Sequence, residues 1–258
     1  FRNVIAEVLP CISLCTDPMY LWDEYIGIYS DGENYNGGYD TTLNYWQDWE
    51  RPINIELFEP EQSETVIINR SAGIKIQGGF TRSFPQKSLG IYFKSKFGYT
   101  SLAYQIFPDK QINLKRFILR NGGNDWNQSI LLDGLFSNIA KQIKNIDYQS
   151  YKPSIVYING QFWGIYNIRE KIDEYYVKSN YEIDSDDIDL LENNMKVIVG
   201  DADDYQQIID YISINDLSEA IHYNYVASKI DIDAYINYQI LEIYFANRDW
   251  PQNNQKYW

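Results

Sequence analysis

Apolar and polar residues alternate along several short stretches of the first two thirds of the chain. A period of two residues is typical of β-strands whose two faces differ in burial. Residues 4–16 fit a strand interrupted by Pro10, and residues 154–173 fit a hairpin, because Asn159-Gly160 is a turn pair between two alternating segments. The other predicted strands are INIELFEP from Ile53, the segment around Ile74 and Ile76, Lys87 to Phe93, and FILR from Phe117.

Helical spacing of apolar residues replaces this alternation in other segments. DPMYLWD from Asp17 suits a capped turn or a short helix. A longer helix is predicted after the NGGNDW turn, from the spacing of Ile130, Leu131, Leu135, Ile139 and Ile143. Arg120 and Asp133 flank that turn, and we interpret them as balancing charge at the helix N-terminus.

After Asp173 the chain becomes acidic and helix-rich. Asp231 or Asp233 is expected to cap the last helix, and His222, the only histidine, is expected at an exposed helical position. With one such histidine, a serine or cysteine triad is not expected. The segments with helical character are DSDDIDLLE, GDADDYQQIIDYI, DLSEAIHYNYVASKI and DIDAYINYQILEIYFANRDW.

These patterns together predict an α+β protein with two parts. Residues 1–170 form a basic, β-rich part, and residues 171–258 form an acidic, helical part. Cys11 and Cys15 lie on the first predicted strand, where a spacing of four places them about 13 Å apart. That separation is too long for a disulfide between them.

Charge is distributed unevenly along the chain. The net charge of −14 argues against nucleic acid or an anionic membrane as the main partner, and no apolar run reaches the length of a membrane span. Between Arg70 and Arg120, however, ten basic residues face one acid, a charge of +9, so the remainder carries −23. Either an anionic ligand such as a nucleotide or a basic sheet face balanced by the acidic part explains this segment.

A candidate phosphate-binding segment lies inside this basic region. Gly78-Gly79 form a turn between two predicted strands, followed by Arg82 and by Lys87 at the start of the second strand. Glycine lets backbone N–H groups approach an anion, and lysine adds a point charge. The alternative is an ordinary hairpin turn with a surface lysine beside a strand.

A candidate metal and phosphate site lies near the end of the sequence. In NRDWPQNN, Asp249 and Asn254 are five residues apart, the separation of the aspartate and asparagine in the protein-kinase catalytic loop H-R-D-x-x-x-x-N. Asn247 replaces the histidine of that pattern. The alternative is a polar turn after a helix, in which the asparagines bind nearby backbone groups.

Six blocks of the sequence, taken together, resemble the CotH family, the spore coat protein H type of atypical protein kinases. They occur in the order that such proteins show and extend over essentially the whole chain. The blocks are LPCISLCTDPMYLWD, NYWQDWERP, GIKIQGGFTRSFPQKSLGIYF, LRNGGNDWNQSILLDG, VYINGQFWGIYNIREKID and NRDWPQNNQKYW.

This resemblance implies a divergent two-lobed protein-kinase-like fold that binds ATP and Mg²⁺. It implies transfer of the γ-phosphoryl group to protein Ser or Thr, with Lys87 on the triphosphate, Asp249 as the catalytic aspartate and Asn254 as a metal ligand. Asp249 also counts among the expected metal ligands. Arg169 and Glu170 would lie near the lobe connection and the nucleotide, together with Arg82.

The resemblance also implies a second metal-binding aspartate some residues after NNQKYW, so we expect more sequence beyond Trp258. Two alternatives remain open: a non-catalytic module for surface or coat assembly, and a carbohydrate-active or carbohydrate-binding protein, which the many aromatic residues and carboxylates would suit. A bacterial cell surface or secreted location is expected, with the spore coat or the mother-cell cytoplasm as the alternative.

Overall fold

The protein has an α+β structure, as predicted. A computed structural model describes residues 8–33, 42–60, 65–108, 110, 113–251 and 253–258. Residues 4–7 of the first predicted strand therefore lie outside the described residues. The chain divides into two compact units, the first formed by Phe1–Leu135 with Gln149–Lys171, the second by Phe136–Tyr148 with Ile172–Trp258.

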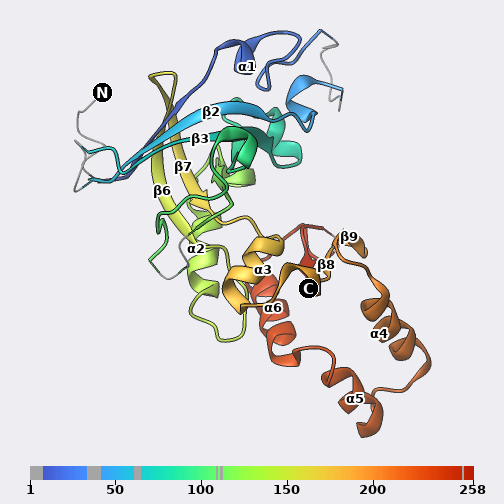
Figure 1. Cartoon of the computed structure of the whole chain (residues 1–258). Helices are drawn as coiled ribbons and strands as arrows, with labels where there is room; N and C mark the ends of the chain where they lie inside the picture. The colour runs from blue at the N-terminus through green and yellow to red at the C-terminus, as the bar shows by residue number, and fades with distance from the viewer. Residues whose placement is uncertain (1–7, 34–41, 61–64, 109, 111–112, 252) are drawn as a thin grey trace. The chain divides into compact units, whose positions relative to one another are not determined.

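The first unit is a closed barrel of seven strands (Figure 1). Neighbours in the order β1-β2-β3-β4-β5-β7-β6 are antiparallel, and the parallel pairing of β1 with β6 closes the ring. The strands are β1 (Cys11–Cys15), β2 (Arg51–Phe58), β3 (Ile68–Gln77), β4 (Ser88–Tyr92), β5 (Arg116–Arg120), β6 (Tyr151–Ile158) and β7 (Gln161–Arg169). Both cysteines of β1 are free thiols, as their spacing predicted.

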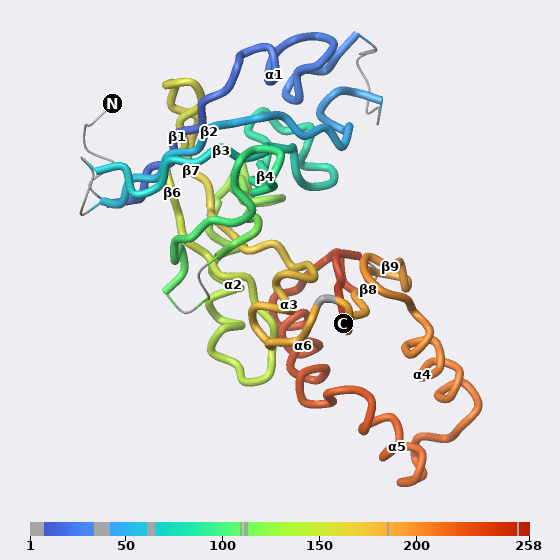
Figure 2. Tube along the Cα trace, in the orientation of Figure 1, coloured from blue at the N-terminus to red at the C-terminus, as the bar shows by residue number. Residues whose placement is uncertain are grey.

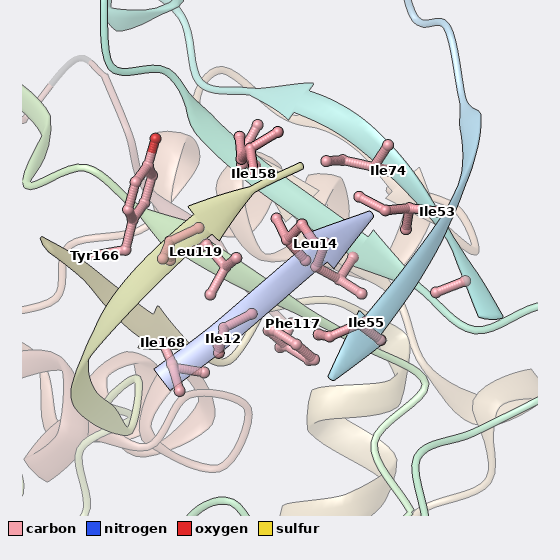
Figure 3. Packing of buried hydrophobic residues seen from close by; sticks show 14 of the residues in the cluster. Ile12, Leu14, Ile53, Ile55, Ile74, Phe117, Leu119, Ile158, Tyr166 and Ile168 are labelled. Carbon is pink, nitrogen blue, oxygen red and sulfur yellow. The ribbon is translucent and has the colours of Figure 1, made fainter. Parts of the chain in front are cut away.

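Side chains from all seven strands form the barrel core (Figure 3). Alternate residues such as Ile12 and Leu14 of β1, or Phe117 and Leu119 of β5, are almost fully buried. Burying each such side chain stabilises the fold by roughly 1.5–3 kcal/mol before entropy is counted. All five residues of β4 are buried, so this strand is covered on both faces.

The predicted hairpin and turn are confirmed. β6 and β7 pair around Asn159-Gly160, whose φ angles of 48° and 79° are the left-handed values of a type I′ turn. Among the described residues, short helical segments lie in several of the other connections. They are α1 (Met19–Trp22) and the 3₁₀ turns η1 (Asn44–Trp46), η3 (Phe80–Ser83), η4 (Ser95–Phe97) and η5 (Gly123–Asp125).

Helix α2 (Leu132–Ala140) is shorter than the helix predicted from residue 130 to residue 143. Ile130 has a φ of 63° and therefore lies before the helix. Asp125 ends the preceding turn by accepting hydrogen bonds from the Ser129 hydroxyl at 2.6 Å and from the Leu132 backbone N–H at 3.1 Å. The polar turn therefore delays the start of the helix.

The second unit contains helices and a small sheet. Its helices are α3 (Glu174–Tyr181), α4 (Asp203–Ile214), α5 (Ala220–Ala227) and α6 (Ile232–Tyr244), with the 3₁₀ turn η6 (Ser185–Asp187). The sheet has the order β10-β8-β9 and comprises β8 (Leu190–Glu192), β9 (Lys196–Val199) and β10 (Lys256–Tyr257). Asp231, one of the two expected caps of α6, accepts the Ala234 N–H at 2.9 Å.

The helix predicted for DSDDIDLLE is wrong, because this segment is η6 followed by β8. Ile188 and Leu190 are buried, and Asp189 between them is exposed. This alternation is the burial pattern of an extended chain. His222 lies on α5 and is only partly exposed, with Nδ1 2.8 Å from the Tyr211 hydroxyl.

The chain passes from one unit to the other three times (Figure 2). The break after Lys171 lies beside the boundary expected between residues 170 and 171, whereas the sequence did not indicate that residues 136–148 belong with the second unit. Within that unit, Phe136 stacks on Phe245 with ring centroids 4.1 Å apart. No helix among the described residues is long and apolar enough to cross a membrane.

Candidate functional site

The loop after α6 brings Asp249 and Asn254 into direct contact. Asn254 Nδ2 donates to Asp249 Oδ2 at 2.9 Å, and both side chains are exposed. The Asn253 N–H donates to the Asp249 carbonyl at 3.0 Å, and Asn254 has a φ of 60°, so a tight turn carries the chain back to the aspartate. The separation of five residues thus brings the amide of Asn254 onto the carboxylate of Asp249.

This loop is fastened at both ends within the second unit. Asn247 Nδ2 donates to Glu242 Oε2 of α6 at 2.6 Å, while Asn247 Oδ1 accepts the Asp249 N–H at 3.0 Å. On the other side, the Gln255 N–H donates to Asn193 Oδ1 at 3.1 Å, and Asn193 N–H donates to the Gln255 carbonyl at 2.9 Å. These contacts also fit the interpretation of a polar turn, in which asparagine side chains bind backbone groups.

Carboxylate and amide oxygens suit Mg²⁺, which is commonly held by one or two protein groups together with water and substrate phosphates. Asp249 and Asn254 therefore fit the ion that the kinase resemblance implies. In the described part of the chain, this loop included, no group of three or more His, Cys, Asp or Glu side chains is arranged as a metal site. The acidic segment from Asp184 to Asp189 instead forms local bonds, such as Lys178 Nζ to Asp184 Oδ1 at 2.7 Å.

Lys87 is buried, so the interpretation of it as a surface lysine is wrong. Its side chain is 5% exposed, and Nζ donates to the carbonyls of Arg82 at 2.6 Å and Phe84 at 3.1 Å. The ammonium also lies over the Tyr45 ring, 4.1 Å from its centroid. Burial lowers the pKa of Lys87 to about 8, because the charged form loses its hydration.

Arg82 binds the same loop from its other end. Nε donates to the Gly78 carbonyl at 2.6 Å, and Nη1 donates to the carbonyls of Tyr45 and Trp46, each at 3.1 Å. Gly78 adopts a φ of 106°, a backbone conformation that side chains disfavour. Arg82 and Lys87 together therefore hold the segment from Gly78 to Lys87 in one conformation.

Arg169 and Glu170 follow each other at the end of β7 and have different partners. Arg169 is 2% exposed and donates through Nη1 to Asp133 Oδ2 at 2.6 Å and through Nη2 to Gln149 Oε1 at 3.1 Å. Burial lowers the pKa of Arg169, and Asp133 opposes that shift.

Glu170 is also buried. Its Oε2 accepts the Ser150 N–H at 2.9 Å and lies 3.6 Å from the Lys110 ammonium. The Lys110–Glu170 ion pair was not expected from the sequence, which gave Lys110 no separate role. Arg120 and Asp133, interpreted from the sequence as charge balance at the helix N-terminus, bind each other with Nε 2.5 Å from Oδ2, and Asp133 also binds Arg169.

Acids from other segments neutralise much of the basic region from Arg70 to Arg120. Lys94 and Lys96 both pair with Glu50, a carboxylate that is almost fully buried. Lys75 pairs with Asp48 at 2.7 Å. Asp133 and Glu170, which follow the basic region in the sequence, pair with Arg120 and Lys110. The structure therefore favours the interpretation of a balanced basic sheet for these residues.

The candidate residues fall into sets that belong to different units. Arg82 and Lys87 share one loop of the first unit, and Arg169 and Glu170 lie together at the end of β7 in the same unit. Asp249 and Asn254 form their pair in the second unit. The β8 and β9 hairpin, which carries Asn193, was missed; the sequence LLENNMKVIV, with apolar residues on both sides of Asn-Asn, was the available signal.

A comparison with curated proteins finds no match to this chain. The sequence model of one family, described as CotH kinase protein, matches residues 74–258. That range includes the Gly78–Lys87 loop, the end of β7 and the Asp249–Asn254 loop, and it covers more than half of the chain. The chain belongs to the CotH family.

Proposed function

We propose that this protein is a kinase that transfers the γ-phosphoryl group of Mg-ATP to serine or threonine hydroxyls of another protein, and that its units form a divergent two-lobed kinase-like fold. Membership of a family described as CotH kinase protein supports the proposal. The observation that carries it is the contact of 2.9 Å between Asp249 and Asn254, the two residue types that a kinase catalytic loop places at this spacing.

In this proposal Asp249 orients the acceptor hydroxyl and accepts its proton, as an exposed carboxylate fixed by its loop is able to do. Asn254, with Asp249, holds Mg²⁺. The bound ion supplies positive charge against the phosphate oxygens. Positioning of the acceptor is thereby assigned to a loop that is fastened to α6 and to the β8–β9 hairpin.

The nucleotide contacts of the proposal are Lys87, Arg82, Arg169 and Glu170. A lysine ammonium has three N–H donors, and Lys87 uses two of them on the carbonyls of Arg82 and Phe84. We assign the third to a phosphate oxygen. Arg82 contributes mainly by holding the Gly78–Lys87 loop, so that the backbone there is ordered before the nucleotide binds.

The test is phosphoryl transfer from radiolabelled ATP to dephosphorylated casein, with protein purified from the whole open reading frame. Asp249→Asn is expected to lower the transfer rate by roughly 10²–10⁴-fold, the usual contribution of a positioned general base. Nucleotide binding is expected to persist, because the amide keeps the shape of the loop. Asp204→Asn, at an exposed position of α4 in the same unit, is the matched control and should leave the rate unchanged.

A non-catalytic scaffold is the second candidate, and one observation favours it. Arg82 and Lys87 already bind backbone carbonyls, and much of the basic region is paired with acids. Thermal unfolding with and without Mg-ATP separates the two candidates, because a ligand that binds only the folded state raises the Tm. An unchanged Tm together with an absence of transfer would favour the scaffold.

A further inference from the structure

We propose that Arg120, at the end of β5, is the side chain that presents a binding site for a phosphoryl oxyanion in the first unit. The inference rests on the proposed function only for the identity of the ligand, because the site is defined by charge and geometry alone. To the nucleotide contacts of the proposed function it adds Arg120, the exposed neighbour of the buried Arg169.

The first support is an imbalance of charge. One carboxylate oxygen, Asp133 Oδ2, accepts from both Arg120 Nε and Arg169 Nη1, so two guanidinium groups share one negative charge. The neighbouring carboxylate, Glu170, also favours the charged form of Arg169, but its ion pair is with Lys110. In these contacts three basic side chains, Arg120, Arg169 and Lys110, share two carboxylates.

The second support is the difference in exposure between the two arginines. Arg169 is 2% exposed and uses both terminal nitrogens, on Asp133 and Gln149. The Arg120 side chain is 36% exposed and uses Nε. No partner for its Nη1 or Nη2 exists among the described residues. The terminal nitrogens of Arg120 are thus the donors that this cluster offers to a ligand, next to the buried Arg169.

The third support is that Arg120 is held in place. A Cβ atom added to Gly123 would lie 2.7 Å from Arg120 Nη2, so the glycine turn lies directly beside the guanidinium, whose Nε is bound to Asp133. The turn itself is fixed, since Asn121 is fully buried, donates to the Gln86 carbonyl at 2.6 Å and accepts from the Ser88 hydroxyl at 2.9 Å. A guanidinium held in this way loses little entropy when it binds.

These properties select the ligand chemistry. The two terminal nitrogens of arginine form a planar fork that matches two oxygens of a phosphoryl group, and charge-assisted bonds of this kind are about twice as strong as neutral ones. Two sources carry such a group in the proposed reaction: the triphosphate of the nucleotide and the phosphorylated side chain of the protein product. Both present the same oxyanion to Arg120.

Titration calorimetry at low salt tests the site, with inorganic tripolyphosphate as the probe and the whole protein as the sample. Arg120→Gln is expected to weaken binding roughly tenfold or more, the effect of losing one charge-assisted contact. Arg120→Lys should give an intermediate affinity, because it keeps the charge and loses the fork. Arg70→Gln is the matched control, since it removes one exposed guanidinium from the same unit, and it should bind like wild type.

Arg120→Gln is expected to fold, because Asp133 keeps its bond to Arg169, and circular dichroism checks this. Should Arg120→Gln unfold, Arg120→Lys decides the outcome by itself. Wild-type affinity in the folded Arg120 variants, or a wild-type protein that binds no tripolyphosphate, would overturn the inference. Titrations with ATP and with a phosphoserine peptide then identify the source as the ligand whose affinity depends on Arg120.

The two proposals fail in different ways. If the protein transfers no phosphoryl group but binds tripolyphosphate through Arg120, the proposed function is wrong and the proposed site stands. If Arg120→Gln changes neither the transfer rate nor the affinity for tripolyphosphate, the proposed site at Arg120 is wrong and the proposed function stands.

Discussion

Lys87 shows how far the surroundings of one residue change its chemistry. The residue follows a proline and a glutamine in a polar stretch, which is the sequence context of an exposed lysine. In the structure its ammonium faces the rings of Tyr29 and Tyr45, and two carbonyls accept from it. The charge that acts on it is that of Asp31, which favours the charged form.

This burial predicts a pH dependence of stability. The pKa of about 8 in the folded state lies below the ordinary lysine value of about 10.4, so the unfolded chain binds more protons between these limits. The free energy of unfolding therefore gains a contribution that rises with pH from about 8 to about 10. Lys87→Met should remove that rise, which urea denaturation at pH 7.5 and pH 9.5 measures.

Lys229→Met, at an exposed position in the second unit, is the control for general alkaline effects. A difference in stability between wild type and Lys87→Met that stays constant over this pH range would show that Lys87 titrates as an ordinary surface lysine.

Sequence reasoning found some site residues and misjudged the environment of others. The contact between Asp249 and Asn254 is local, and their spacing of five was visible in the chain. The burial of Lys87 depends on Tyr29 and Tyr45, which precede it by many residues, so no local pattern indicated it. For the same reason the sequence linked Arg120 with Asp133 in the charge balance of one turn, but it did not indicate that Arg169 binds the same carboxylate.

Among the elements, those with several alternating residues were predictable and the shortest ones were not. The β6–β7 hairpin has eight and nine residues around an Asn-Gly turn, so the period and the turn agree. β8 and β9 have three and four residues, too few to show a period, and their acidic surroundings resembled helix N-termini. The pairing of β8 with both β9 and β10 decides their conformation.

Helix α2 provides a test in which helix propensity and packing oppose each other. Replacing a helical glycine by alanine usually stabilises a protein by roughly 0.5–1 kcal/mol. At Gly134, however, a Cβ would overlap the Tyr151 ring of β6. Gly134→Ala is therefore expected to destabilise the fold by about 1–3 kcal/mol, the cost of overpacking. Thermal unfolding measures this loss of stability.

Asn138→Ala, at an exposed position of the same helix, is the matched control. It should raise stability by a few tenths of a kcal/mol through helix propensity alone. A stabilising Gly134→Ala substitution would mean that β6 moves to accept the methyl group and that this helix–strand contact is loose.

At the scale of the whole molecule, the two units differ in how much core each contains. The barrel buries side chains from all seven strands, whereas the buried cluster of the second unit consists of Tyr176, Val177, Ile188 and Leu190. Helix α4 has no buried residue, and α5 buries only Val226.

The charge asymmetry of the sequence is likewise a property of the whole fold, since Glu50, Asp133 and Glu170 come from outside the basic region.

Amide hydrogen exchange should reveal this difference. Local opening is easiest where few apolar contacts are lost, so the amides of α4 and α5 are expected to exchange orders of magnitude faster than those of β4 and β5. Mass spectrometry of peptides from both units, with samples taken from seconds to hours, provides the comparison. Equal protection of α4 and β4 would show that the described packing does not set local stability.

The parallel pairing of β1 with β6 also has a consequence for synthesis. Of the barrel strands β1 is translated first and finds β2 early, but its second neighbour β6, with Cys11 opposite Ile155, is translated only after β3, β4 and β5 as well. Until then one side of β1 carries unpaired amide and carbonyl groups, which are prone to aggregation. The nascent chain is therefore most vulnerable to misassembly before Arg169 leaves the exit tunnel, and it is in that interval that a chaperone would help it most.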